Sequence, residues 1–174
     1  MSILTDTIRK QFKKGDDIRD EDLTTPDTVQ RFDNILYGDD PEWNTMDLYI
    51  PKEEKEKLPI IISFHGGGWV YGDKERYQYY CMSLAERGFA VINFTYRLAP
   101  EFKHPAPLED MNQVAHWIMN HAKDYFLDTE HIYGVGDSAG AHLLVLYTSI
   151  LTNKEYASNY DFKVPEGFQF NALA

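Results

Sequence analysis

Hydrophobic and polar positions alternate along the first part of the chain. Residues 29–50 predict two strands joined by the turn sequence YGDDP, and the second strand has an apolar residue at every other position from Met46 to Ile50. This alternation is typical of antiparallel strands that bury one face. Residues 1–28 are acidic and weakly patterned, and they predict either a helix or a mobile cap.

After residue 58 the pattern changes to short apolar runs separated by amphipathic segments. Strands are predicted at 59–64 (PIIISF), at 89–94 (FAVINF), at 131–136, and at 167–174 (GFQFNALA), where a strand only begins. Helices are predicted at 77–85, 108–122 and 141–151. Alternating strands and helices indicate an α/β fold with a parallel sheet covered on both faces. The last helix is apolar on nearly every side and should therefore be deeply buried.

Charge and composition exclude several classes of function. The formal net charge of −11 over 174 residues repels phosphates and anionic lipids, so we expect no nucleic-acid partner. No run is apolar enough for a signal peptide or a membrane span, which predicts a cytoplasmic protein. Cys81 is the single cysteine and is expected to be a small buried hydrophobe. The cysteine and histidine spacings match no ligand set, so we predict no metal and no organic cofactor.

The sequence GDSAG at 136–140 fits the pattern that presents a nucleophilic serine. A serine on a sharp turn between a strand and a helix has a strained backbone, and the glycines two residues to either side leave room for it. A helix starting at Ala139 adds partial positive charge where an oxyanion would form. The pattern alone is weak, and a glycine-rich structural turn is the alternative. The apolar strand before it and the apolar helix after it favour Ser138 as a nucleophile.

The sequence HGGGW at 65–69 follows the PIIISF run directly. Consecutive glycines leave backbone N–H groups uncovered, so that a carbonyl oxygen can approach them. A flexible turn or a phosphate-binding loop are the alternatives. A phosphate-binding loop normally ends in Gly-Lys-Ser or Gly-Lys-Thr, which is missing here. An oxyanion-binding loop is therefore the favoured interpretation.

Taken together, the motifs resemble the hormone-sensitive-lipase-like branch of the α/β-hydrolases, which includes bacterial carboxylesterases and acetyl esterases. The resemblance covers about residues 30–174 and is carried by HGGGWVYGD (65–73), YRLAPE (96–101), PAPLED (105–110) and GDSAG (136–140). Ala141 stands where many members have glycine. The resemblance implies a doubly wound, mostly parallel sheet with antiparallel N-terminal strands, in which residues 29–174 form the N-terminal part of a hydrolase domain and residues 1–28 a cap or flexible segment.

The resemblance also implies a serine carboxylesterase or lipase-like hydrolase that acts on small short-chain esters through an acyl-enzyme on Ser138. It implies an oxyanion hole formed by three backbone N–H groups, those of Gly66, Gly67 and Ala139. It places two aromatic residues beside the substrate, Trp69 and Tyr71. Three charged residues of the other motifs are expected to be structural: Arg97, Glu101 and Asp110.

The family order is serine, then acid, then histidine, but no histidine in the chain is a convincing base. His65 is expected to support the glycine-rich loop. His142 follows Ser138 by one helical turn, which places it beside the helix and not above the hydroxyl. We therefore expect a chain truncated after the nucleophile helix, without the triad acid and histidine and inactive alone. Its FQFNALA strand would then be an exposed edge, open to a homo-oligomer or to a complementing C-terminal segment.

Two other functions remain open at this level. Amide or formamide hydrolysis uses the same oxyanion-binding groups as ester hydrolysis, so the residues do not separate these reactions. A non-catalytic relative that binds a small ligand is the other alternative. The presence of Ser138 and of the glycines argues against a pure binding protein, because binding alone does not require them.

Overall fold

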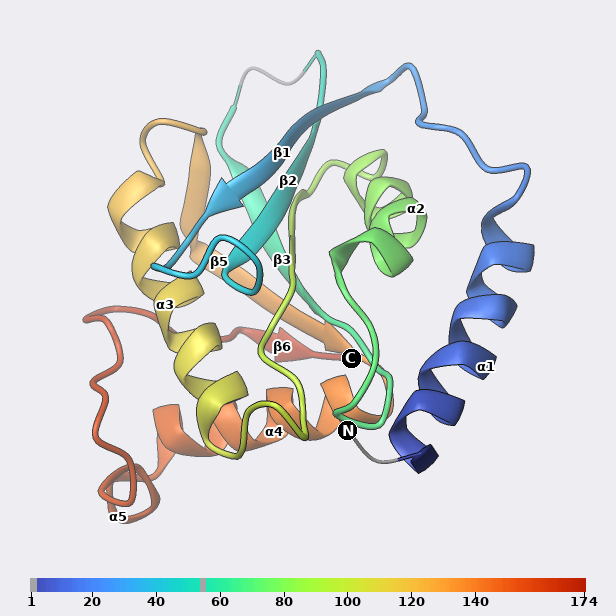
Figure 1. Cartoon of the computed structure of the whole chain (residues 1–174). Helices are drawn as coiled ribbons and strands as arrows, with labels where there is room; N and C mark the ends of the chain where they lie inside the picture. The colour runs from blue at the N-terminus through green and yellow to red at the C-terminus, as the bar shows by residue number, and fades with distance from the viewer. Residues whose placement is uncertain (1–2, 54–55) are drawn as a thin grey trace.

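A mixed sheet of six strands forms the centre of the computed structural model, which describes residues 3–53 and 56–174. The strands are β1 (Val29–Leu36), β2 (Thr45–Pro51), β3 (Leu58–Phe64), β4 (Ala90–Phe94), β5 (Leu127–Gly136) and β6 (Ala172–Leu173). They lie in the order β1-β2-β4-β3-β5-β6 (Figure 1). β2 is antiparallel to both β1 and β4, and the remaining pairs are parallel. The predicted α/β-hydrolase sheet with antiparallel N-terminal strands is confirmed.

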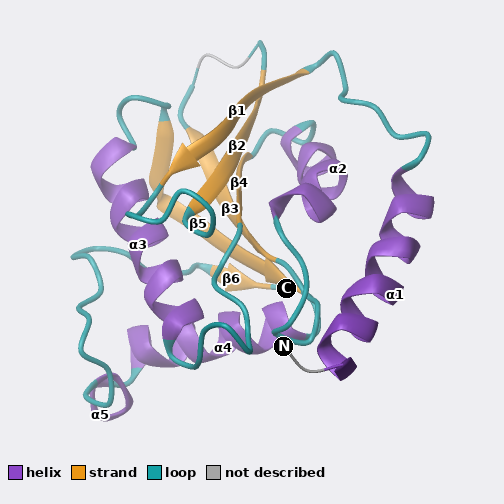
Figure 2. Ribbon diagram, viewed as in Figure 1, coloured by secondary structure: helices purple, strands orange, loops and turns teal. Residues whose placement is uncertain are grey.

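Helices cover both faces of this sheet. They are α1 (Ile3–Asp20), α2 (Lys74–Ala85), α3 (Ala106–His121), α4 (Ala139–Thr152) and α5 (Lys154–Ala157). α2 packs on one face and α3 and α4 on the other, while α1 lies beyond α2 (Figure 2). No helix in the described chain combines the length and the apolar character that crossing a bilayer requires.

The continuous apolar runs of the central strands are explained by two separate hydrophobic clusters. In β3, Ile60 and Ile62 belong to the larger cluster with α3 and α4, whereas Ile61 belongs to the smaller cluster with α2. Successive side chains of a strand point to opposite faces, so a strand buried on both faces needs apolar residues throughout. Cys81 lies in the smaller cluster as predicted, and its burial raises the pKa of the thiol to about 12.

Helix α4 is less buried than its sequence predicts. Its buried face includes Leu143, Leu144, Tyr147 and Ile150, which join the larger cluster. Val145 points away from the sheet and is 56% exposed. The expectation of a deeply buried helix is wrong because α4 covers one face of the sheet and has no second layer over it within the described residues.

The motif residues expected to be structural form contacts away from Ser138. Asp110 is fully buried and accepts hydrogen bonds from the Arg97 backbone N–H at 2.7 Å and from Arg97 Nε at 2.8 Å. Asn44 Nδ2 donates to the same carboxylate at 3.1 Å. Burial raises the pKa of Asp110 to about 6, against the opposing effect of Arg97. The carboxylate thereby ties the loop after β4 to α3.

Candidate active site

Ser138 lies in a sharp turn between β5, which ends at Gly136, and α4, which begins at Ala139. Its backbone has φ 50° and ψ −116°, and a non-glycine residue at positive φ carries about 1–3 kcal/mol of strain. A Cβ on Gly140 would lie 2.1 Å from the Phe64 carbonyl oxygen, so only glycine fits there. Ser138 itself is exposed. The turn therefore presents a hydroxyl at the carboxyl end of β5.

The N-terminus of α4 supplies an unused hydrogen-bond donor beside this hydroxyl. The N–H groups of Gly140 and Ala141 donate to the Asp137 carbonyl at 2.8 and 3.2 Å. The Ala139 N–H has no acceptor among the residues that the structure describes. Since the first N–H groups of a helix lack intrahelical partners and carry partial positive charge, this end of α4 favours an anion.

The glycine loop, residues 65–69, leaves the carboxyl end of β3 and faces the serine turn. Gly67 and Gly68 have φ values of 125° and 63°, which favour glycine. The Gly67 carbonyl accepts from the Val70 and Tyr71 N–H groups at 3.2 and 3.1 Å, which closes the turn. The N–H groups of Gly67 and Gly68 have no acceptor within the described chain.

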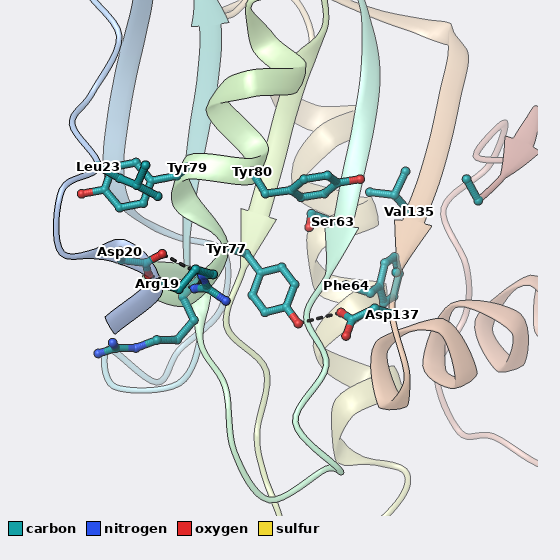
Figure 3. A pocket seen from close by; sticks show the side chains of 13 residues that line it. Arg19, Asp20, Leu23, Ser63, Phe64, Tyr77, Tyr79, Tyr80, Val135 and Asp137 are labelled. Atoms are coloured by element: carbon teal, nitrogen blue, oxygen red, sulfur yellow. Dashed lines mark hydrogen bonds and ion pairs between the residues drawn. The ribbon is translucent and has the colours of Figure 1, made fainter. Parts of the chain in front are cut away.

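Gly66 differs from the other two glycines. Its N–H donates to the Tyr77 hydroxyl at 3.0 Å, and that hydroxyl donates to Asp137 Oδ1 at 2.6 Å. Figure 3 shows the Tyr77 side chain directed at Asp137. Burial, together with the Asp137 carboxylate, raises the pKa of Tyr77, which is thus a neutral donor at neutral pH. The predicted oxyanion donor Gly66 therefore already has an acceptor in this structure.

The buried His65 side chain supports the glycine loop. It is fully buried, its Nδ1 lies 2.8 Å from the Gly66 carbonyl oxygen, and its ring stacks on Tyr96 at 3.9 Å between centroids. The carbonyl can only accept, so Nδ1 carries the proton. Burial lowers the pKa of His65 to about 4, so the ring is neutral at neutral pH.

Acid should destabilise the fold through His65. In the unfolded chain the pKa of His65 is near its ordinary value of 6.5, and in the folded chain it is about 4. The unfolded state therefore binds the proton first, and stability is lost as pH falls from 6.5 to 4, by about 3 kcal/mol in total. Urea unfolding of the wild type and of His65→Gln at pH 7 and pH 4 measures this: the stability advantage of the wild type should shrink by that amount.

The pH dependence of stability has to be compared between the wild type and His65→Gln, because protonation of Asp110 changes the free energy of unfolding in the opposite direction. Its raised pKa favours the folded state as pH falls through about 6, and this contribution is present in both proteins. It cancels in the difference between them. A difference that stays constant from pH 7 to pH 4 would contradict the role given to His65.

A cavity of about 480 Å³ lies over Ser138. Its walls come from the serine turn, the glycines 66–68, Tyr71 and Tyr77, and one face of α1. From α1, Phe12 packs edge-on against the Tyr71 ring at 5.7 Å, and Asp16 accepts a hydrogen bond from the Tyr71 hydroxyl at 2.7 Å. Helix α1 thus contributes one wall of the cavity.

Polar contacts hold α1 in this position. Arg9 donates to both carboxylate oxygens of Glu101, at 2.9 and 2.8 Å, and to the Val70 carbonyl at 2.7 Å. The Arg9 guanidinium lowers the pKa of Glu101. Further along the helix, Asp17 pairs with Arg76 at 2.8 Å. The helix is therefore fixed by ion pairs and hydrogen bonds to α2, to the segment after the glycine loop and to the loop after β4.

A second cavity of about 510 Å³ lies on the other side of Tyr77, between α1, α2 and the ends of β3 and β5 (Figure 3). Tyr79 and Tyr80 of α2 line it, together with Ser63 and Val135 of the strands. It does not include Ser138. Tyr77 and Asp137 line both cavities.

The structure brings most of the predicted site residues together at one cavity but leaves Trp69 outside its wall. Ser138, Gly66, Gly67 and Tyr71 line the same cavity, and Ala139 adjoins it. Trp69, predicted to border the substrate, is 44% exposed, and its ring meets the His142 ring edge-on at 5.4 Å. Trp69 is not part of the cavity wall in this structure, so its contact with substrate stays a prediction.

None of the six histidines, all within the described residues, forms a hydrogen bond with Ser138. His65 and His142 have the contacts given above, and His104 lies beside the Tyr160 ring. The others bond elsewhere: His116 to the Lys163 carbonyl, His121 to Asp124 and His131 to Asp128. No group of three or more His, Cys, Asp or Glu side chains in the described chain could hold a metal ion.

Comparison with known proteins identifies the family. The BD-FAE family profile matches residues 46–173. Versiconal hemiacetal acetate esterase of Dothistroma septosporum is 38% identical over 97 residues, which are 55% of this chain and 30% of that protein. Ethyl acetate hydrolase of Pseudomonas putida is 28% identical over 157 residues, 88% of this chain and 49% of that protein.

Solved structures give the same result. Esterase B from Lactobacillus rhamnosis superposes with a TM-score of 0.90 at 30% identity, over 97% of this chain and 54% of that one. The chain thus spans about half the length of these relatives or less. The matched region includes the glycine loop and the serine turn. The chain belongs to the BD-FAE family of hormone-sensitive-lipase-like α/β-hydrolases.

Proposed function

We propose that this chain supplies the nucleophile and the oxyanion-binding loop of a serine carboxylic ester hydrolase that acts on short-chain esters. The observation that carries the proposal is the exposed Ser138 hydroxyl, held on a strained turn opposite N–H groups that have no acceptor in the described chain. Relatives named as esterases, among them an ethyl acetate hydrolase, support the reaction class. The aromatic wall of the cavity favours a small apolar ester.

In the proposed reaction, Ser138 Oγ bonds to the ester carbonyl carbon as its proton passes to a base, and the carbonyl oxygen becomes an oxyanion. The free N–H groups of Gly67, Gly68 and Ala139 are the available donors to that oxyanion. Each such donor contributes about 3–4 kcal/mol to transition-state stabilisation. For Gly66 to act as a donor, as the family resemblance implies, its N–H must leave Tyr77. Collapse releases the alcohol, and water then hydrolyses the acyl-enzyme on Ser138.

In this proposal, none of the six histidines, in the positions they occupy here, is the base that accepts the Ser138 proton. A further polypeptide segment or a second chain could supply a histidine and its acid, since β6 lies at the edge of the sheet with Leu173 40% exposed. The proposal includes a cytoplasmic location, which the lack of any internal disulfide supports.

A labelling experiment tests the nucleophile without requiring turnover. The chain is incubated with a p-nitrophenyl alkylphosphonate, with and without imidazole as an external base, and the adduct is located by peptide mass spectrometry. We expect a single adduct on Ser138 that forms faster with imidazole, and at least a 100-fold slower reaction in Ser138→Ala.

Ser149→Ala is the matched control, because Ser149 lies in the same helix and its hydroxyl bonds to the Val145 carbonyl at 2.9 Å. It should label like the wild type. Labelling that does not depend on Ser138, or a wild type that stays unlabelled in imidazole, would contradict the proposal.

A further inference from the structure

The Tyr77 hydroxyl connects the two loops that carry the proposed chemistry. It accepts the Gly66 N–H of the glycine loop at 3.0 Å and donates to Asp137, the neighbour of Ser138, at 2.6 Å. One hydroxyl has one proton to give and lone pairs to accept with, so both bonds form together without conflict. The bond to a carboxylate is charge-assisted and is therefore the stronger of the two.

Helix α2 places this hydroxyl. The helix begins at Lys74, only a few residues after the glycine loop, and the Asp73 side chain caps it by accepting the Arg76 N–H at 3.1 Å. Its inner face is anchored in the smaller hydrophobic cluster by Cys81 and Met82. Tyr77 therefore extends from a fixed element towards two loops.

The loops touch where Tyr77 joins them. A Cβ on Gly66 would lie 2.4 Å from Asp137 Oδ2, so the glycine allows the carboxylate to approach the backbone. On the other side, His65 Nδ1 holds the Gly66 carbonyl at 2.8 Å. Because a trans peptide is planar, its C=O and N–H point in opposite directions, and fixing the Gly66 carbonyl also fixes the direction of the Gly67 N–H. Gly66 is thus held at both of its backbone polar groups.

We propose that Tyr77 is a positioning residue: its hydroxyl accepts the Gly66 N–H and donates to Asp137, and thereby fixes the glycine loop against the serine turn, so that the free N–H groups of the loop are in place before substrate binds. The inference depends on the proposed role of Ser138. It assigns Tyr77 no contact with the reacting atoms. Preorganised donors are effective because they need no rearrangement at the moment of reaction.

The test replaces Tyr77 with phenylalanine, which removes only the hydroxyl. We expect imidazole-supported phosphonylation of Ser138 to slow by about tenfold or more, which corresponds to the loss of one charge-assisted hydrogen bond. Hydrogen exchange of the Gly66 amide, followed by NMR, should accelerate by at least about fivefold. Tyr80→Phe, an exposed tyrosine of the same helix, should change neither rate.

A second variant tests whether Tyr77 acts through Asp137. Asp137→Asn keeps an acceptor for Tyr77 but removes its charge, so the effect of Tyr77→Phe on labelling should be smaller in that background. Because the two side chains are in direct contact, their effects on the free energy of unfolding should likewise be less than additive. If Tyr77→Phe labels at the wild-type rate while Ser138→Ala does not label, the positioning role is wrong and the nucleophile stands. If the wild type does not label, the assignment of Ser138 as the nucleophile is wrong. An unchanged Gly66 exchange rate in Tyr77→Phe overturns the positioning role, independently of the labelling result.

Discussion

Replacing Gly67 with alanine is expected to slow phosphonylation of Ser138 by about 10²–10³-fold, the usual loss when an oxyanion donor is removed. A Cβ at this position would lie 1.9 Å from the Tyr71 carbonyl oxygen, and φ is 125°, so alanine cannot keep the present backbone. The loop would have to give up the turn in which the Gly67 carbonyl accepts two hydrogen bonds. The Gly67 N–H would then point away from the proposed oxyanion. The labelling rate at fixed imidazole concentration measures the effect.

Gly68→Ala is the matched control for this change. Gly68 also has a positive φ, 63°, but a Cβ there meets nothing within 4 Å. Alanine costs about 1–2 kcal/mol in this left-handed conformation and retains the N–H. Labelling should fall no more than severalfold. Equal rates for the two variants would show that the close contact at Gly67 does not determine the loop geometry.

Replacing Lys74 with methionine is expected to lower the free energy of unfolding by about 3–5 kcal/mol, the cost of leaving a buried charge without its partner. The Asp47 carboxylate is fully buried, and Lys74 Nζ lies 2.9 Å from it. The Tyr49 hydroxyl and the Asn34 N–H also donate to Asp47, but neither carries a positive charge. Urea unfolding at pH 7 measures the loss.

An exposed ion pair provides the control for this substitution. Lys13 lies 2.6 Å from Asp17 on α1, and both side chains are about half exposed. Lys13→Met should leave the urea midpoint nearly unchanged, because water screens such a pair. In the double variant Lys74→Met with Asp47→Leu, part of the lost stability should return, since no buried charge is then left unpaired. Equal losses for Lys74→Met and Lys13→Met would contradict this account.

Elements set by local pattern were predictable from the sequence. The apolar runs of β3 and β4 indicated buried parallel strands, and the glycines around Ser138 indicated a strained turn; the structure has both. Burial of α4 was overestimated, because an apolar sequence shows which residues tolerate burial and not whether a neighbour covers them. Val145, for example, is apolar but has no neighbour over it in the part of the chain that the structure describes, and is exposed.

Contacts between distant polar residues could not be predicted. Arg9 and Glu101 are separated by 92 positions, and Tyr77 and Asp137 by 60. Neither partner of such a pair has a local signal, because a charged or hydroxylated side chain at a surface position is equally compatible with solvent. For the same reason the ion pairs that hold α1 beside the cavity became visible only in three dimensions.

β3 has a consequence for how this protein can change in evolution. Its alternating isoleucines divide between two clusters, and the strand leads directly into the glycine loop. Inserting or deleting one residue within β3 would exchange the two sets of side chains and also shift the glycine loop along the sheet. Length variation in this strand therefore affects folding and chemistry together. Insertions that alter substrate preference are consequently expected in α1, which lines the cavity without belonging to the sheet.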